Sequence, residues 1–290
     1  MVMKYSELYL DARRELMEVE EPREAGIQVR QLIAFYSGLD HARIIADSEK
    51  YVQDDVIVAV KDAVRRLVAG EPMAYIMGEW EFYGLNLVVT PSVLIPRDDT
   101  VAVTEAAINK ALFLEEKPRI LDLCTGSGCI GLAIASRVKD AKVTLADLSR
   151  DALAVAKKNV TLHKMSGRVS CVQVDAMKEP PTFLGQFDLI VSNPPYITTE
   201  EMQGLDKSVK DHEPHMALWG GADGLDFYRS ITEKCKKCLK PGGFLCYEFG
   251  EEQGDAICRI LTDNGFTICD RVRDYHNVER AVVAQYCKED

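Results

Sequence analysis

The stretch from Phe187 to Tyr196 has the sequence Phe-Asp-Leu-Ile-Val-Ser-Asn-Pro-Pro-Tyr. Its first six residues, Phe187–Ser192, form an apolar run rich in β-branched and aromatic residues, which predicts a buried strand. Two prolines cannot continue a hydrogen-bonded ladder, so the strand should end before them. Asn193–Tyr196 is therefore expected at the carboxyl end of a strand, the edge at which open α/β sheets bind ligands.

The tetrapeptide Asn193–Tyr196 is suited to accepting hydrogen bonds from an amino group. Asn193 precedes a proline and is held extended, and Pro194 and Pro195 stiffen the turn that carries its side chain. Asn193 Oδ1 and the Pro194 carbonyl can accept the two hydrogens of an NH2 group, and Tyr196 adds an aromatic face. We therefore predict that all four residues bind substrate and that Asn193, Pro194 and Tyr196 are catalytic. The alternative is a plain turn, because Asn and Pro are common turn formers.

An α/β fold with a Rossmann-like, seven-stranded sheet is predicted around this strand. From Arg119 onward, β-prone runs alternate with helical patterns, which is typical of a parallel sheet with helices on both faces. Strands are expected at 120–123, 142–146, 169–174, 187–192, 243–249, 266–271 and 281–286. Helices are expected at 131–138, 150–163, 225–239 and 252–264, with Pro241–Gly243 as the turn into the fifth strand. Too few residues join the last two strands for a parallel crossover, so they should form an antiparallel hairpin at one edge.

The pattern divides the chain into three regions. Residues 1–77 are dense in helix formers, with apolar residues at helical spacing, and are predicted to form a small helical domain. Residues 78–96 contain two β-prone runs around Gly84 and are predicted to form a β-hairpin linker. Residues 97–290 are predicted to form the catalytic domain.

A glycine-rich segment after the first strand of the sheet predicts a cofactor site. Gly126, Gly128 and Gly131 satisfy the Gly-x-Gly-x-x-Gly pattern, and Asp147 ends the second strand about 20 residues further on. An acidic residue in that place can accept from ribose hydroxyl groups. The pattern alone also fits a nicotinamide dinucleotide.

Two further carboxylates favour S-adenosylmethionine as the cofactor. Asp122 opens the turn, where it can bind an ammonium group, directly or through water, but would repel a pyrophosphate. Asp175 ends the third strand and can accept from an adenine amino group, although it could equally cap its own turn. The predicted cofactor-binding residues are Asp122, Cys124, Thr125, Gly126, Ser127, Gly128, Asp147, Asp175, Ala176 and Asn193.

Composition restricts the class of partner and the compartment. The formal net charge of −11 argues against direct nucleic-acid binding, because phosphate binding draws on clustered Lys and Arg. The nine cysteines are scattered, the first 20 residues are acidic, and no apolar run reaches the length of a membrane span. We therefore expect a cytoplasmic protein without disulfides or membrane contact. Cys235 and Cys238 form a Cys-x-x-Cys without a second pair, so no metal is expected.

Several segments together resemble the release factor glutamine methyltransferases, a family of class I methyltransferases. They are Ile95–Arg97 with Thr100, Asp122–Gly128, Asp147–Leu153, Ser192–Ile197, Glu213–Leu218 and Gly221–Leu225. The resemblance covers essentially the whole chain. Cys124 stands where the family usually has glycine, a small-for-small change that should keep the turn, and Asp98 and Val101 replace the usual Pro and Glu.

This resemblance implies transfer of a methyl group from S-adenosylmethionine, leaving S-adenosylhomocysteine. The acceptor would be the side-chain nitrogen of the glutamine in the Gly-Gly-Gln loop of peptide chain release factors, which act in translation termination. Asn193–Tyr196 would bind that glutamine, and Cys124–Gly128, Asp147 and Ala176 would line the cofactor pocket. The helical domain would recognise the substrate protein, and we expect the enzyme to be a monomer.

Three other functions compete with this interpretation. A nucleic-acid adenine N6-methyltransferase uses the same tetrapeptide, because an exocyclic amino group presents the same two donors. It should, however, carry a basic cleft or a target-reading domain. A nicotinamide-dependent oxidoreductase would leave Asn193–Tyr196 and Asp122 unexplained, and a non-catalytic binding module that keeps the fold is the third alternative.

Overall fold

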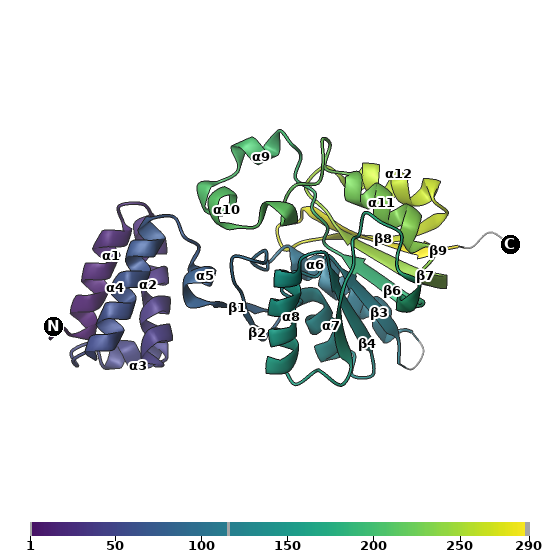
Figure 1. The fold of residues 1–290 in the computed structure, drawn as a ribbon. Coiled ribbons are helices and arrows are strands. Elements are labelled where there is room, and N and C mark those ends of the chain that lie inside the picture. The colour runs from purple at the N-terminus through teal and green to yellow at the C-terminus, as the bar shows by residue number, and fades with distance from the viewer. Residues whose placement is uncertain (1, 115–116, 288–290) are drawn as a thin grey trace. The chain divides into compact units, whose positions relative to one another are not determined.

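The structure, a computed structural model, describes residues 2–114 and 117–287. The chain divides into two compact units (Figure 1). The first unit holds the chain up to Gly78 together with Asp206–His212, and the second holds Glu79–Leu205 and the chain from Glu213 onward. No helix among the described residues is long and apolar enough to cross a membrane.

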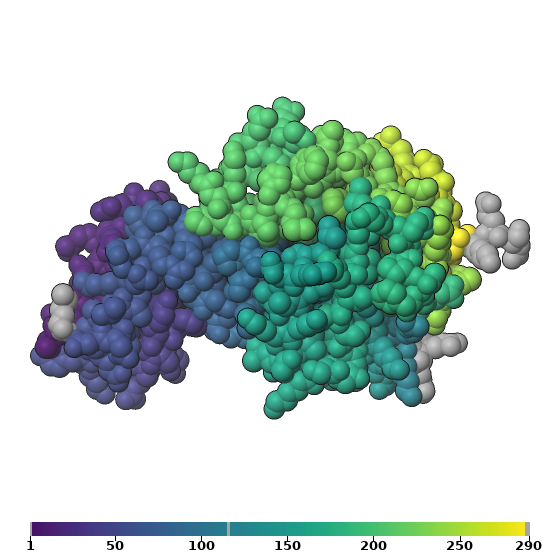
Figure 2. Space-filling model, viewed as in Figure 1, coloured from purple at the N-terminus to yellow at the C-terminus, as the bar shows by residue number. Residues whose placement is uncertain are grey.

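The first unit is a bundle of short helices, of which those before Gly78 are purple to blue in Figure 2. Its helices are α1 (Tyr5–Leu16), α2 (Pro22–Ser37), α3 (His41–Ala46), α4 (Asp54–Val68) and α5 (Met73–Met77), joined by α10 (Lys207–His212) from later in the chain. Pro22 starts α2 and Gly38 ends it in the left-handed conformation, φ 67°. Apolar residues at helical spacing, such as Leu8, Leu32 and Val60, are fully buried between the helices.

The second unit is built on a seven-stranded sheet, as predicted. Its strands are β3 (Arg119–Leu123), β4 (Lys142–Asp147), β5 (Val169–Gln173), β6 (Phe187–Ser192), β7 (Leu239–Glu248), β8 (Phe266–Arg273) and β9 (Glu279–Tyr286). Their order across the sheet is β5-β4-β3-β6-β7-β9-β8. The first five of these run parallel, and β9 pairs antiparallel with both β7 and β8. The predicted edge hairpin is thus confirmed, with β9 inserted between β7 and the edge strand β8.

Helices cover both faces of this sheet, which gives the predicted layered α/β architecture (Figure 1). One face packs against α6 (Thr100–Leu112), α7 (Cys129–Arg137) and α8 (Arg150–Leu162), through buried residues such as Leu132 and Val191. The other face packs against α11 (Asp226–Cys235) and α12 (Gly254–Asp263), through residues such as Tyr228 and Tyr247. Side chains alternate between the faces along each strand, so neighbouring strand residues enter different cores.

A separate hairpin, β1 (Glu79–Phe82) and β2 (Leu85–Val88), turns at Tyr83 and Gly84, which both have positive φ. This confirms the predicted hairpin around Gly84. The buried side chain of Asn159 in α8 fixes it within the second unit by accepting from the Val88 N–H at 2.7 Å and donating to the Val88 carbonyl at 3.0 Å. The hairpin therefore packs against α8.

Two details of the sequence prediction were wrong. The helix expected over 225–239 ends at Cys235, because Leu239 is buried and already pairs with Phe187 as part of β7. Pro241–Gly243 does not precede the fifth strand but lies inside it, as an irregularity in the pairing of β6 and β7. Gly242 supplies the positive φ of 77° that this irregularity needs, and its carbonyl accepts from Gln285 Nε2 at 2.9 Å.

Candidate active site

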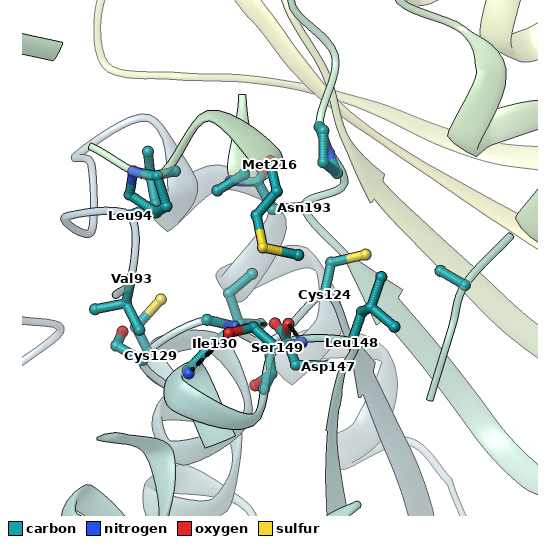
Figure 3. Close-up of a pocket in the computed structure, with 18 of the residues that line it drawn as sticks. Val93, Leu94, Cys124, Cys129, Ile130, Asp147, Leu148, Ser149, Asn193 and Met216 are labelled. Carbon is teal, nitrogen blue, oxygen red and sulfur yellow. Dashed lines mark hydrogen bonds between the residues drawn. The ribbon is translucent and has the colours of Figure 1, made fainter. Parts of the chain in front are cut away.

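A pocket lies at the carboxyl ends of β3, β4, β5 and β6, where the strand order reverses direction between β3 and β6 (Figure 3). This is the topological switch point at which open α/β sheets bind ligands. Nine of the residues predicted for the site line this pocket: Cys124, Thr125, Gly126, Ser127, Asp147, Asp175, Ala176, Asn193 and Pro195. Four others lie outside its wall: Asp122, Gly128, Pro194 and Tyr196.

Asp147 is the carboxylate on the pocket wall. Its Oδ2 accepts from the Gly126 N–H and its Oδ1 from the Ser149 N–H, both at 2.9 Å (Figure 3). Burial raises the pKa of Asp147, while hydrogen bonds from backbone N–H groups lower it. Each oxygen keeps a free lone pair, so the carboxylate is fixed in place and can still accept from a ligand.

Asp122 lies beneath the turn rather than on the wall. Its Oδ2 accepts from the Thr125 hydroxyl at 2.6 Å and from the Gly131 N–H at 2.9 Å, whereas its Oδ1 is buried without a partner. Burial, with a smaller contribution from the charge of Asp147, raises the pKa of Asp122 to about 7, against the two hydrogen bonds that lower it. A buried oxygen without a partner is costly, and a cation or water at the turn would satisfy it.

The glycine turn has a backbone that few other residues could adopt. Gly126 and Gly128 have φ values of 54° and 85°, and a Cβ added at Gly131 would come within 2.2 Å of Leu145. Gly128 therefore shapes the turn and caps α7 without touching the pocket. Cys124, which stands where the family usually has glycine, also has a left-handed backbone conformation, with φ 62°. It keeps the predicted turn, although this conformation is strained for a non-glycine residue.

Asp175 is on the wall but is also engaged in its own turn. Its Oδ1 accepts from the Met177 N–H at 2.9 Å, and its Oδ2 forms an ion pair with Lys178 at 3.1 Å. Both interpretations of this residue, as a turn cap and as a pocket residue, thus have a basis in the structure. Ala176 lies beside it on the wall, and its carbonyl accepts from the buried Ser230 hydroxyl at 3.3 Å.

The tetrapeptide follows β6 and presents Asn193 to the pocket. Asn193 Nδ2 donates to Thr100 Oγ1 at 3.5 Å, which leaves the amide oxygen free. Tyr196 is not among the residues that line the pocket, and it lies in a tight place, where a Cβ added at Gly250 would be 3.1 Å from its ring. Its carbonyl accepts from Gln253 Nε2 at 3.0 Å. The structure thus places Asn193 on the pocket wall and Tyr196 outside the wall.

Two loops that the sequence analysis did not assign to the site close the pocket. They contribute Ser92, Val93, Leu94, Pro96 and Arg97 from one side and Pro214, Met216 and Ala217 from the other. Glu213 joins them, since its buried carboxylate pairs with Arg97 and accepts from the Ile95 N–H at 3.2 Å. In Figure 3 the Met216 side chain extends into the pocket near Cys124. Both segments contain prolines and belong to the stretches that resemble the family, and these were the sequence signals that could have pointed to them.

Other wall residues simply follow the predicted ones along the chain. Leu148 and Ser149 come after Asp147, and Cys129 and Ile130 come after the glycine turn. The rule that ligands bind at the carboxyl ends of strands could have found them. Among the described residues, no group of three or more His, Cys, Asp or Glu side chains could hold a metal ion.

Known proteins share the sequence over most of its length. A sequence profile described as PrmC N-terminal domain matches residues 7–78, and one described as Methyltransferase small domain matches residues 102–209. A release factor glutamine methyltransferase of Clostridium acetobutylicum is 38% identical over 253 residues, which are 87% of this chain and 88% of that protein. Its counterpart of Geobacter sulfurreducens is 37% identical over 275 residues, 94% of each chain. The solved structure of a methyltransferase from Pyrococcus furiosus is similar in fold, with a TM-score of 0.50, 17% identity and coverage of 79% of this chain and 100% of that one.

The sheet order and the pocket at the glycine turn define a class I methyltransferase. The antiparallel strand β9, inserted between β7 and β8, distinguishes this sheet from the sheet of the dinucleotide-binding fold, which has no such strand. Within that class, the chain belongs to the release factor glutamine methyltransferase family. The resemblance seen in the sequence is confirmed, and neither the oxidoreductase nor the adenine methyltransferase alternative accounts for these relatives.

Proposed function

We propose that the protein transfers a methyl group from S-adenosylmethionine to the side-chain amide nitrogen of the glutamine in the Gly-Gly-Gln loop of peptide chain release factors. One observation carries this proposal: the fixed amide of Asn193 lies at the pocket with Nδ2 directed to Thr100 and Oδ1 free. The names of the relatives, which specify release factor and glutamine, support the choice of substrate.

The pocket residues fit the cofactor. Asp147 would accept from the ribose hydroxyls, Asp175 and Ala176 would contact the adenine, and Asp122 would bind the ammonium of the amino-acid moiety, directly or through water. The partnerless Asp122 Oδ1 and the buried, partnerless Ser127 hydroxyl support this assignment, because both need a polar group that the chain does not supply. When bound, S-adenosylmethionine supplies an electrophilic methyl group on a cationic sulfur.

The chain's own contribution is placement. A glutamine amide nitrogen is a poor nucleophile, because its lone pair is delocalised into the carbonyl group. Asn193 Oδ1 and the Pro194 carbonyl would each accept one N–H of that amide, which polarises the nitrogen and fixes its direction. No strongly basic side chain is needed, since the alkylated nitrogen is positive and loses its proton readily.

The remaining parts of the proposal concern the partner and the setting. We propose that residues 1–77 recognise the release factor, that 78–96 serve as the linker, and that 97–290 carry the chemistry. The net charge of −11 favours a protein over a nucleic acid as direct partner. We propose that the protein is cytoplasmic, because release factors act in the cytoplasm. We also propose that it is a monomer, and sedimentation equilibrium tests this oligomeric state.

The test uses purified protein, labelled S-adenosylmethionine and purified release factors. Label should enter an intact release factor and should not enter a variant whose Gly-Gly-Gln glutamine is replaced by alanine. A single-stranded adenine-containing oligonucleotide is the control for the rival substrate. Label in the oligonucleotide, or equal label in both forms of the release factor, would overturn the proposed function.

A further inference from the structure

We propose that Glu248, together with the hydroxyl of Thr100, is a positioning residue that decides which end of the Asn193 amide faces the pocket. The proposal rests on the proposed function, because it assigns a task in the same site. Thr100 lies on the pocket wall, and Glu248 lies behind it, outside the wall. They would act by holding Asn193 in the orientation that can accept an N–H from a substrate amide.

Sheet register brings these residues together from distant parts of the chain. Ser192 pairs with Tyr247 at the parallel ends of β6 and β7, so Asn193 and Glu248 are the next residues on neighbouring strands. Tyr247 enters the core that contains α11, and the next side chain therefore points to the opposite face. That face is covered by α6, whose first residue is Thr100. Asn193, Thr100 and Glu248 thus meet where three elements end or begin.

The carboxyl of Glu248 has no other evident task. The residue is 2% exposed, and its Oε2 is buried without a hydrogen-bond partner. Burial raises the pKa of Glu248 to about 8, while hydrogen bonds from the side chains of Thr100 and Asn193 lower it. Burying a carboxyl group costs free energy of folding. Its position against Asn193 therefore suggests a functional role.

Hydrogen-bond polarity links the charge of Glu248 to the direction of the Asn193 amide. An ionised carboxylate can only accept, so the Thr100 hydroxyl and the Asn193 NH2 group must be the donors in their hydrogen bonds with it. Thr100 Oγ1 is then left to accept, and the group it meets is Asn193 Nδ2, at 3.5 Å. The amide oxygen consequently faces the pocket. This arrangement is the productive one.

A protonated Glu248 removes that constraint. Its hydroxyl can donate to Thr100 Oγ1, and the Thr100 hydroxyl is then free to donate to Asn193 Oδ1. The amide would turn, and Nδ2 would face a substrate N–H that it cannot bind. Methyl transfer should therefore be faster when Glu248 is ionised.

Other charged and titratable groups face Glu248 from several elements. Asp99 at the start of α6 raises the pKa of Glu248, and Arg280 from β9 lowers it. Tyr196, Tyr228 and Cys129 are also near, but burial raises the pKa of each, so all three stay neutral between pH 6 and about 9. Asp99 and Arg280 form an ion pair with each other at 3.2 Å.

The first experiment changes Thr100 and uses Thr104 as a matched control. Thr104 lies one turn further along α6, is equally buried, and donates to the Thr100 carbonyl at 2.8 Å. Thr100→Val should lower the single-turnover methylation rate about tenfold, the size expected for one hydrogen bond, without changing S-adenosylhomocysteine affinity. Thr100→Ser should restore the rate, and Thr104→Val should leave it unchanged. Equal losses in Thr100→Val and Thr104→Val would overturn the proposal.

The second experiment does not depend on methylation. In 15N-labelled protein, the side-chain NH2 signals of Asn193, assigned by their loss in Asn193→Ala, should shift with pH as Glu248 ionises. The shift should be absent in Glu248→Gln. If these signals titrate in the variant as in the wild type, or do not titrate in either protein, the proposal is wrong. If the wild type methylates no release factor while the signals titrate as described, only the proposed function fails.

The pH dependence of the reaction is the third readout. At saturating cofactor, the single-turnover rate of the wild type should rise with pH across the range in which Glu248 ionises. The rate in Glu248→Gln should be lower and independent of pH over the same range. A profile that is the same in both proteins would assign the titration to another group and overturn the proposal.

Discussion

The two ends of the pocket are built in different ways. At the end formed by the Cys124–Gly128 turn, the decisive contact is between the Gly126 N–H and Asp147, within one β3–α7–β4 unit. At the other end, Asn193 is held by Thr100, which is 93 residues away in the chain. The first end can be recognised from spacing along a short segment. The second depends on side chains that only the completed sheet brings together.

Removing Asn193 should have the largest effect and should act on the second end alone. Asn193→Ala loses the acceptor for the substrate amide, and we expect turnover to fall about a hundredfold or more if the contact contributes a few kcal/mol to positioning. Cofactor affinity and melting temperature should stay near those of the wild type. Single-turnover methylation of a release factor measures the first quantity, and calorimetry measures the other two.

The Asn193→Asp variant sharpens this test. Asp is at home in turns and nearly isosteric, so a residue that only shaped a turn would tolerate the change. An added negative charge beside the cationic sulfur would instead stabilise the ground state and oppose the loss of that charge during transfer. Near-normal rates in both variants would leave the tetrapeptide a structural turn.

Removing Asp147 should act on the first end alone. Asp147→Ala loses the carboxylate proposed for the ribose hydroxyls, and each hydrogen bond to a charged group contributes about 1.5–3 kcal/mol, so S-adenosylmethionine should bind at least about tenfold more weakly. The rate at saturating cofactor should change far less than in Asn193→Ala. Isothermal titration against the wild type decides the point, and equal affinities would show that the ribose lies elsewhere.

What the sequence could predict differs between local features and long-range contacts, as the two ends of the pocket do. The seven strands, the edge hairpin and the glycine turn were all expected, because each follows from a local apolar period or a short spacing. The end of α11 and the irregularity at Pro241–Gly243 were not predicted. Leu239 belongs to β7 because it pairs with Phe187, and local propensity carries no information about that pairing. For the same reason no pattern pointed to Glu248 or to the pairing of Glu213 with Arg97. Both depend on register and on contacts between distant segments.

A pH experiment tests Asp122, the fully buried aspartate of the first end. Because the pKa of Asp122 in the free protein is raised to about 7, an ionised Asp122 that holds the cofactor ammonium would have a lower pKa in the complex. S-adenosylmethionine affinity should then rise as pH increases through about 7, and level off before the cofactor amino group itself loses its proton near pH 8.

Two controls isolate Asp122 as the cause. Adenosine has no ammonium group, so its affinity should not change over the same range. Asp122→Asn should bind S-adenosylmethionine more weakly and without the rise. If the affinity still rises with pH in the variant, another residue is the titrating group. Asp147 would then be the first candidate, because burial raises its pKa as well.

The smallest effect is expected at Cys124, where the chain departs from the usual glycine. A non-glycine residue at φ 62° carries a strain of about 1–2 kcal/mol, which Cys124→Gly would relieve. Glycine also gains freedom in the unfolded chain, worth about 0.5–1 kcal/mol in the opposite direction, and loses the packing of a half-buried thiol. The terms nearly cancel, so the free energy of unfolding in urea should stay within about 1 kcal/mol of the wild type.

Cys124→Val puts a β-branched side chain in the same backbone conformation and should destabilise by about 1–3 kcal/mol. If glycine and valine instead shifted the free energy of unfolding equally, the thiol itself would be the stabilising group and the turn would not depend on its backbone conformation.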